Sequence, residues 1–183
     1  MIAVRNLTVR FGEKTVHENR SFDLPEEGIV LLRGDSGTGK TTLLRVLSGL
    51  LKPQSGTVSG LNGRTVSMAF QEPRLLGWKT ALENLLLVTE EAKAKELLRA
   101  LDLEDVAHQR ADTLSGGQQQ RVSLLRAFAH STDVVLLDEP FSGLDETNRL
   151  RVKKLIETAK LVVLVTHNED DADLLHVTKT IVL

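Results

Sequence analysis

The feature that most constrains the fold of this 183-residue chain is a glycine-rich stretch between an apolar segment and a helical one. Residues 34–41 read Gly-Asp-Ser-Gly-Thr-Gly-Lys-Thr, residues 28–33 are mostly apolar, and leucines recur at helical spacing from 43 to 51. The pattern predicts a buried strand, a tight loop and a helix. Because such a loop directs backbone N–H groups and the positive end of the helix at one place, it predicts a phosphate-binding site.

Individual side chains of this loop have separate expected roles. Lys40 offers a mobile positive charge to β- and γ-phosphates, and the hydroxyl of Thr41 offers a ligand to Mg²⁺. A turn that matches the pattern by chance is the alternative, but the strand before it and the helix after it favour phosphate binding. Asp35 adds a negative charge near the phosphates and is expected to point outward. The remaining residues expected at the nucleotide are Gly34, Ser36, Gly37, Thr38, Gly39 and Thr42.

Two acids follow a second apolar segment. Residues 134–140 read Val-Val-Leu-Leu-Asp-Glu-Pro, which predicts a buried strand that ends in two carboxylates. Ligands of a parallel sheet bind beyond the carboxyl ends of its strands, so both acids are expected beside the phosphate loop. Asp138 is expected to hold Mg²⁺ through a water, and Glu139 to accept a proton from an attacking water. An acidic turn without function is the alternative.

The rest of the chain predicts one α/β domain with a mostly parallel sheet. Alternating apolar residues at 7–11, followed by 22–24, indicate an N-terminal antiparallel β segment. Residues 72–113 carry an amphipathic stripe and predict a short helical insert in a core formed by 1–71 and 114–183. The remaining elements are expected as helices at 118–130, 146–160 and 169–175 and as strands at 134–138, 161–166 and 180–183.

Composition excludes several classes of protein. The chain has no cysteine, which excludes disulfides, thiolate metal sites and a cysteine nucleophile. Its formal net charge of −2, without a cluster of basic residues, argues against a nucleic-acid partner. The apolar runs 134–137 and 161–165 are too short to span a membrane, and the first residues do not resemble a secretion signal. We therefore expect a protein of a reducing compartment.

A third motif identifies a family. Residues 114–118 read Leu-Ser-Gly-Gly-Gln, which on physical grounds alone is best explained as a helix N-cap with a glycine-rich lead-in. Together with the phosphate loop and the paired acids, however, this string resembles the signature of the ATP-binding cassette (ABC) ATPases. Further motifs follow the order of that family. They are Gln71 in Phe-Gln-Glu-Pro, Asp145 in Ser-Gly-Leu-Asp, His167 in Thr-His, and Phe11 where the family has an adenine-stacking aromatic.

The resemblance implies a P-loop NTPase fold, ATP and Mg²⁺ as ligands, and a head-to-tail dimer. In that family ATP lies between the phosphate loop of one subunit and the signature of the other, here Ser115, Gly116, Gly117 and Gln118. The resemblance further implies that His167 contacts the γ-phosphate and that Gln71 links Mg²⁺ and water to the helical insert. Phe11 remains open, because it also completes the apolar face of the first strand.

Two functions are consistent with this sequence. The first is the ATP-hydrolysing subunit of a membrane transporter, working with a second, identical cassette and an integral membrane permease on the cytoplasmic face of the membrane. Residues 71–80 resemble the bacterial importer branch for small oxyanions and organosulfonates, and Trp78 is expected to meet a partner. The second is a soluble ATPase of iron–sulfur cofactor assembly. A P-loop kinase explains neither the signature nor Glu139, and the insert lacks the heptads of DNA-repair members.

Two expectations concern the end of the chain. The acidic group Glu169, Asp170, Asp171 and Asp173 is expected to complement the N-terminus of a helix rather than to bind metal. The chain ends at Leu183, shortly after His167, so we expect no effector control from a C-terminal extension.

Overall fold

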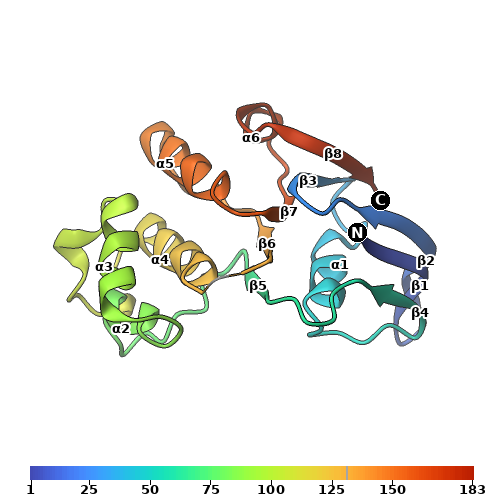
Figure 1. The fold of residues 1–183 in the computed structure, drawn as a ribbon, viewed down its shortest axis with the longest axis horizontal. Coiled ribbons are helices and arrows are strands. Elements are labelled where there is room, and N and C mark those ends of the chain that lie inside the picture. Colours follow the sequence, from blue (N-terminus) through green and yellow to red (C-terminus); the bar gives the residue numbers. More distant parts are fainter. Residues whose placement is uncertain (131) are drawn as a thin grey trace.

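The computed structural model describes residues 1–130 and 132–183, and of Glu169 the backbone only. Its centre is a five-stranded sheet in which every neighbouring pair is parallel (Figure 1). The strand before the phosphate loop pairs with the strand before His167, although their first paired residues, Gly28 and Leu161, are far apart in the sequence. In order across the sheet, the strands are β5 (Val66–Ala69), β6 (Val134–Asp138), β7 (Leu161–Val165), β3 (Gly28–Arg33) and β8 (Val177–Val182).

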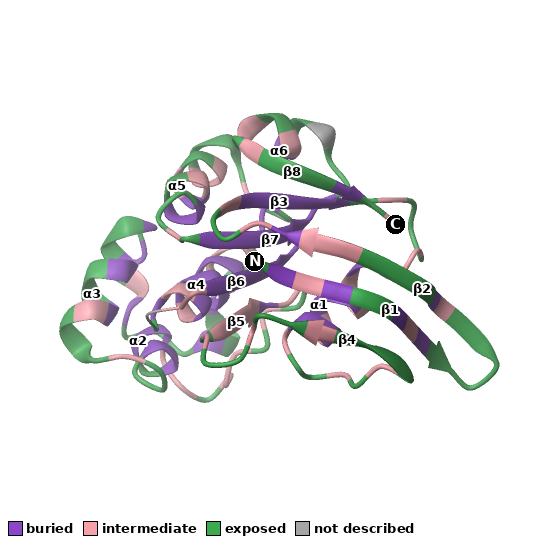
Figure 2. Ribbon diagram, turned by 45° about the vertical axis from the view of Figure 1, so that its right-hand side comes forward, coloured by how far each residue is buried: buried purple, intermediate pink, exposed green. Residues whose placement is uncertain are grey.

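Successive residues of the central strands enter two different hydrophobic cores. On β7, Val162 and Leu164 face one core, while Val163 and Val165 face the other. The helices α4 (Gly116–Phe128) and α5 (Glu146–Ile156) cover the first face, and α1 (Lys40–Leu47) covers the second. Because both faces are covered, the central strands are buried along their length, as Figure 2 shows, and their sequences are continuously apolar.

A smaller antiparallel sheet packs beside α1. Its strands are β2 (Lys14–Leu24), β1 (Ile2–Phe11) and β4 (Ser55–Ser59), in that order. The buried positions of β1 change parity at Asn6, which has φ 50° and lies at a register shift. Leu7 and Val9 are fully buried as expected, but Phe11 is 49% exposed and does not complete that face.

The expected insert is helical and packs on α4. It contains α2 (Ala81–Leu85), α3 (Glu91–Ala100) and the 3₁₀ turns η1 (Glu104–Val106) and η2 (Ala111–Thr113). Thr80 caps α2 with a capping box, and the buried side chains of α3 belong to the same core as those of α4. Among the described residues, no helix is long and apolar enough to cross a membrane.

Several element boundaries differ from the expected ones. The helix expected from 118 starts at Gly116, because Ser115 is its N-cap and both glycines lie inside the first turn. The helix expected to reach 160 ends at Ile156, and the last strand spans Val177–Val182 instead of 180–183. The helix expected at 169–175 is α6 (Glu169–Leu174). The antiparallel return begins at Lys14, well before 22, because it pairs with β1 as far as Phe11.

Candidate functional site

A pocket of about 350 Å³ lies at the carboxyl ends of the central strands. It brings together side chains from β1, the phosphate loop, the segment after β5, and the ends of β6 and β7. The expected site residues that line it are Phe11, Ser36, Gly37, Gly39, Lys40, Thr41, Thr42, Gln71, Asp138, Glu139 and His167. Gly34 and Asp35 line an adjoining hollow that also reaches His167.

The phosphate loop has the backbone conformation that its glycines predict. Gly37 and Gly39 have φ of 84° and 93°, which side-chain-bearing residues rarely adopt. A Cβ on Gly39 would lie only 2.4 Å from a methyl carbon of Val16, so the loop is also pressed against β2. The hydroxyl of Thr38 donates to the carbonyl of Asp35 (3.0 Å) and closes the turn. Asp35 itself is exposed, in line with the expectation that it points outward.

Lys40 is held inside this loop. Its side chain is only 5% exposed, and Nζ donates to the carbonyl oxygens of Gly34 (2.6 Å) and Asp35 (2.8 Å). The ammonium group therefore lies at the centre of the turn, where α1 also directs its N-terminus. A positive charge and a helix N-terminus at one point suit a polyphosphate.

Asp138 and Thr41 are neighbours in the pocket and are joined by a hydrogen bond. Asp138 ends β6 and is almost fully buried, and burial raises the pKa of its carboxyl group. A hydrogen bond from Thr41 and the charges of Arg45, His167 and Lys40 oppose that rise in pKa. The two oxygen-bearing side chains and Gln71 line one wall, and Mg²⁺ prefers such donors.

Glu139 is the most unusual residue of the site. Its backbone is left-handed (φ 53°), a conformation that costs energy for a residue other than glycine. Oε2 accepts a hydrogen bond from the backbone N–H of His167 (3.3 Å), while Oε1 is buried without a hydrogen-bond partner among the described residues. Nε2 of His167 lies 3.3 Å from that Oε1. Burial raises the pKa of Glu139, and the neighbouring His167 opposes this.

The signature residues do not line the pocket. Ser115 and Gln118 form a capping box at the start of α4, in which each side chain accepts a hydrogen bond from the other's backbone N–H. Asp145 caps α5 in a similar way through the N–H of Asn148 (2.8 Å). A Cβ on Gly117 would lie 3.3 Å from the carbonyl of Gly143, so the signature and the loop before α5 are neighbours. Gly116 has open space around it.

Some residues at the site were not expected from the sequence. Lys14 and Val16 line the pocket because β2 runs back beside Phe11. Asp171, expected only to complement a helix, is buried; it accepts a hydrogen bond from the hydroxyl of Thr166 (3.1 Å) and pairs with Arg149. The pairing of β1 with β2 can be anticipated from the alternation of residues, but no sequence signal indicates the contacts of Asp171.

Two proteins with similar sequences are named as ATP-binding import proteins. A family profile described as "ABC transporter" matches residues 17–142. The aliphatic sulfonates import ATP-binding protein SsuB 1 of Shouchella clausii is 44% identical over 170 residues, which cover 88% of this chain and 69% of that protein. The taurine import ATP-binding protein TauB of Rhizobium johnstonii is 38% identical over 186 residues, covering 89% of this chain and 70% of that protein.

Solved structures with a similar fold are also ATP-binding cassettes. The ATP-binding cassette MJ0796, solved as a dimer in a post-hydrolysis state bound to ADP and Pi, matches with a TM-score of 0.87. It is 29% identical, and the match covers 100% of this chain and 94% of that one. A second dimeric structure of MJ0796, described as a bacterial ABC transporter cassette, gives a TM-score of 0.84. The expected fold is therefore confirmed, and the chain belongs to the ABC transporter family of ATP-binding proteins.

Proposed function

We propose that this chain hydrolyses ATP as one of two identical subunits and thereby drives a membrane importer of small organosulfonates. Membership of the family makes it an ATP-binding ATPase of a transporter; the dimer, the permease and the solute are the proposed parts. The observation that supports the catalytic assignment most is the pocket itself. It places the phosphate loop, Glu139 and His167 together, although they follow three different strands.

Catalysis in this proposal depends on positioning and charge. The loop N–H groups and Lys40 hold the β- and γ-phosphates, while Glu139 accepts a proton from the water that attacks the γ-phosphorus. The bond from the γ-phosphorus to the bridging oxygen breaks, and ADP and phosphate are released. The buried Oε1 of Glu139, which lacks a hydrogen-bond partner among the described residues, is the atom we assign as proton acceptor. His167, 3.3 Å away, orients it and reaches the γ-phosphate.

The residues around Asp138 fit a bound Mg²⁺. Mg²⁺ usually takes one or two carboxylate or hydroxyl ligands from the protein and the rest from phosphates and water. The hydrogen-bonded pair of Thr41 and Asp138, with Gln71 on the same wall, supplies that kind of donor set. We assign Thr41 as a direct ligand, Asp138 as a ligand through water, and Gln71 as the link to the insert. Bound there, Mg²⁺ would neutralise phosphate charge.

A second copy would complete the site. Ser115, Gly116, Gly117 and Gln118 lie outside the pocket of their own chain, and the solved cassettes described above are dimers. A two-fold pair would place the signature of each copy over the phosphates held by the other. Asp145, which starts α5 next to Gly117, would lie at the same contact. Phe11, half-exposed at the mouth of the pocket, is assigned to the adenine.

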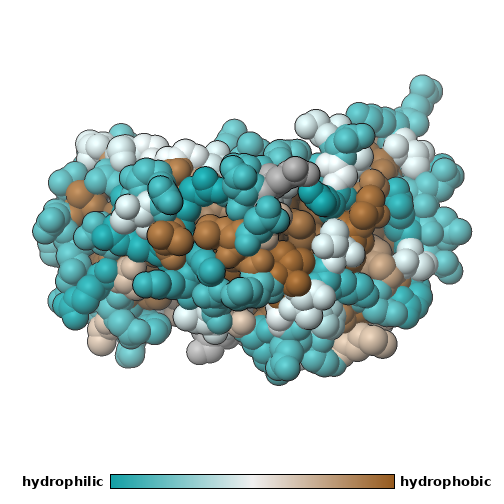
Figure 3. All heavy atoms as spheres, turned by 90° about the horizontal axis from the view of Figure 1, so that it is seen from above, coloured by the Kyte–Doolittle hydropathy of each residue, from teal (hydrophilic) through white to brown (hydrophobic). Residues whose placement is uncertain are grey.

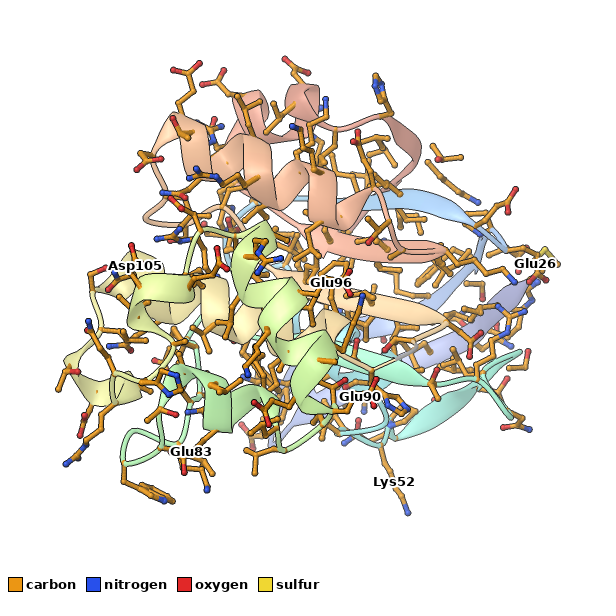
Figure 4. All side chains as sticks on the ribbon, turned by 60° about the vertical axis from the view of Figure 1, so that its left-hand side comes forward. Glu26, Lys52, Glu83, Glu90, Glu96 and Asp105 are labelled. Atoms are coloured by element: carbon orange, nitrogen blue, oxygen red, sulfur yellow. The ribbon has the colours of Figure 1, made fainter. Side chains whose placement is uncertain are left out.

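The helical insert at 72–113 is the proposed contact with the permease. A groove of about 430 Å³ lies at the start of the insert and is lined by residues 72–75, Gly77, Ala111, Asp112 and Gln119. Trp78, which follows Gly77, is 69% exposed. The apolar residues Leu86, Leu87 and Val88 are also exposed, each by 39–49%. Acidic side chains, among them Glu83, Glu90, Glu96 and Asp105, extend outward from the insert (Figure 4). A permease loop that is apolar at its centre would suit this surface.

The solute and the location rest on the relatives. Those described above are named for aliphatic sulfonates and taurine, so an organosulfonate is the proposed solute and the cytoplasmic face of the membrane the proposed place of action. Because the relatives are import subunits, the iron–sulfur alternative is not supported.

The raised pKa of Glu139 predicts an acid limit to activity. Because the proton acceptor must be ionised, kcat should fall as the pH is lowered through the pKa of Glu139, at a pH above the ordinary carboxyl value of 4.5. The test is the pH dependence of kcat at saturating ATP, with ATP affinity measured at each pH as the control. An acid limb at or below the ordinary carboxyl pKa would contradict the assignment.

The proposed function is tested by separating coupling from chemistry. In vesicles that contain the chain, its permease and a trapped sulfonate-binding protein, solute should stimulate the ATPase of the wild type. Gln71→Ala should keep basal turnover within about threefold and lose this stimulation, because Gln71 joins the pocket to the insert. His167→Ala should lower turnover about 100-fold with and without solute, as for loss of a donor to developing charge. Two variants that behave alike would show that the roles are wrongly divided.

A further inference from the structure

His17 is a buried histidine to which the proposed mechanism assigns no role. It lies on β2 next to Val16, which lines the pocket. His17 itself is only 1% exposed. It pairs across the small sheet with Val9 of β1; its ring contacts Gly39 of the phosphate loop and does not line the pocket. A buried histidine in such a place requires an account of both ring nitrogens.

One ring nitrogen is bonded to the phosphate loop. Nε2 lies 3.0 Å from the carbonyl oxygen of Gly39, and since a carbonyl only accepts, Nε2 carries the hydrogen and donates it. Nδ1 is therefore an acceptor, and it is buried with no hydrogen-bond partner among the described residues. Burial lowers the pKa of His17, which agrees with a neutral ring. The ring of His17 therefore donates one hydrogen bond to Gly39, while its other nitrogen, Nδ1, stays buried without a hydrogen-bond partner among the described residues.

The carbonyl of Gly39 belongs to the peptide that leads into Lys40. Gly39 is the N-cap of α1 and makes no side-chain cap, and its carbonyl already accepts the first helical bond from the N–H of Leu43 (2.9 Å). The peptide group is planar and trans, so the direction of this carbonyl also sets the direction of the N–H of Lys40, which points the opposite way. Two donors on the carbonyl leave that peptide little freedom to rotate.

The packing leaves the same peptide little freedom to move. A Cβ on Gly39 would lie 2.7 Å from Nε2 of His17, so the ring touches the backbone of the loop directly. Gly39 also has a φ of 93°, a conformation from which a glycine can move at low cost unless its surroundings restrain it. The ring of His17 and the side chain of Val16 supply that restraint.

We propose that His17 is a positioning residue for ATP binding, whose Nε2–H orients the Gly39–Lys40 peptide so that the N–H of Lys40 faces the phosphates. The proposal rests on the proposed phosphate site, which Lys40→Ala tests by itself. His17 touches no reacting atom, so it acts on nucleotide affinity rather than on the chemical step. A purely space-filling histidine would affect only the stability of the fold.

The central test replaces His17 by leucine, which has a similar size and no hydrogen-bonding atom. Titration calorimetry with Mg-ATP should show a dissociation constant raised about five- to tenfold, as for the loss of one hydrogen bond. At saturating ATP, kcat should remain within about twofold of the wild type. Thermal unfolding of the free protein should show equal or higher stability, because the unpaired Nδ1 is removed. His108→Leu, at an exposed histidine of the insert, is the matched control and should bind ATP normally.

Two polar variants test the hydrogen bond itself. Glutamine places an N–H at nearly the distance of Nε2, so His17→Gln should restore the dissociation constant to within about twofold of the wild type. Asparagine is shorter and should not restore it. If the leucine variant does not fold, the difference in ATP affinity between His17→Gln and His17→Asn still tests the hydrogen bond. Equal ATP affinities in His17→Gln and His17→Asn, or wild-type affinity in His17→Leu, would overturn the proposal. If Lys40→Ala still weakens ATP binding in that case, the proposed phosphate site is retained and only the role of His17 is refuted.

Discussion

Glu139→Gln is expected to lower kcat about 10²–10⁴-fold and to hold two copies together around ATP. The substitution keeps the size of the side chain but removes the proton acceptor, and a general base is worth about 3–5 kcal/mol of the barrier. It also removes a negative charge next to the triphosphate, which lowers repulsion when a dimer closes. The left-handed backbone at Glu139 is compatible with glutamine to the same degree, so the fold should be kept.

Light scattering with Mg-ATP measures the association directly. The variant should appear as a dimer that retains two ATP molecules, whereas the wild type should return to monomer as ATP is consumed. Glu96→Gln, a matched change on the exposed surface of α3, should behave as the wild type (Figure 4). If Glu139→Gln remains monomeric at saturating ATP and turns over near the wild-type rate, Glu139 is not the base.

Lys40→Ala is expected to weaken ATP binding about 100-fold or more. The Nζ of Lys40 lies at the centre of the loop, and a hydrogen bond from this charged group to a phosphate is worth about 1.5–3 kcal/mol. Alanine removes the charge that the phosphates require and also the contacts that shape the turn. The loss should appear in the dissociation constant itself and not only in turnover.

Calorimetric titration with Mg-ATP tests this prediction. Lys52→Ala removes the same charge from a side chain that extends into solvent (Figure 4), and it should leave affinity unchanged. Unfolding temperatures of both variants establish that the fold is retained. An unchanged dissociation constant for Lys40→Ala would contradict the role assigned to Lys40.

Exposed hydrophobic side chains are also present on the face that is seen from above. Seen from above, hydrophobic side chains gather among hydrophilic ones on this face (Figure 3). Leu150 of α5 and Val182 at the end of β8 are exposed hydrophobic residues, and Val182 also lines the hollow next to His167. The sequence does not predict their exposure, because an isolated leucine or valine in an amphipathic pattern gives no sign of it.

The amino-acid sequence by itself determined the local geometry of the site. The turn at Gly37 and Gly39 and the carboxylates after β6 depend on a few consecutive residues, whose backbone preferences do not require the rest of the fold. The same holds for the cap at Ser115, although the helix begins two residues earlier than the apolar pattern suggests. Hydrophobic periodicity likewise predicted the alternation of strands and helices.

Only the tertiary structure decided which of these pieces meet. The order of strands brings Glu139 next to His167 and leaves Ser115 outside the pocket, and it turns Phe11 outward while Leu7 and Val9 are buried. It also places His17 against Gly39 of the phosphate loop and Asp171 against Thr166. These contacts join residues that are distant in the chain. They follow from how sheets and helices pack around two cores, which local preference and periodicity do not specify.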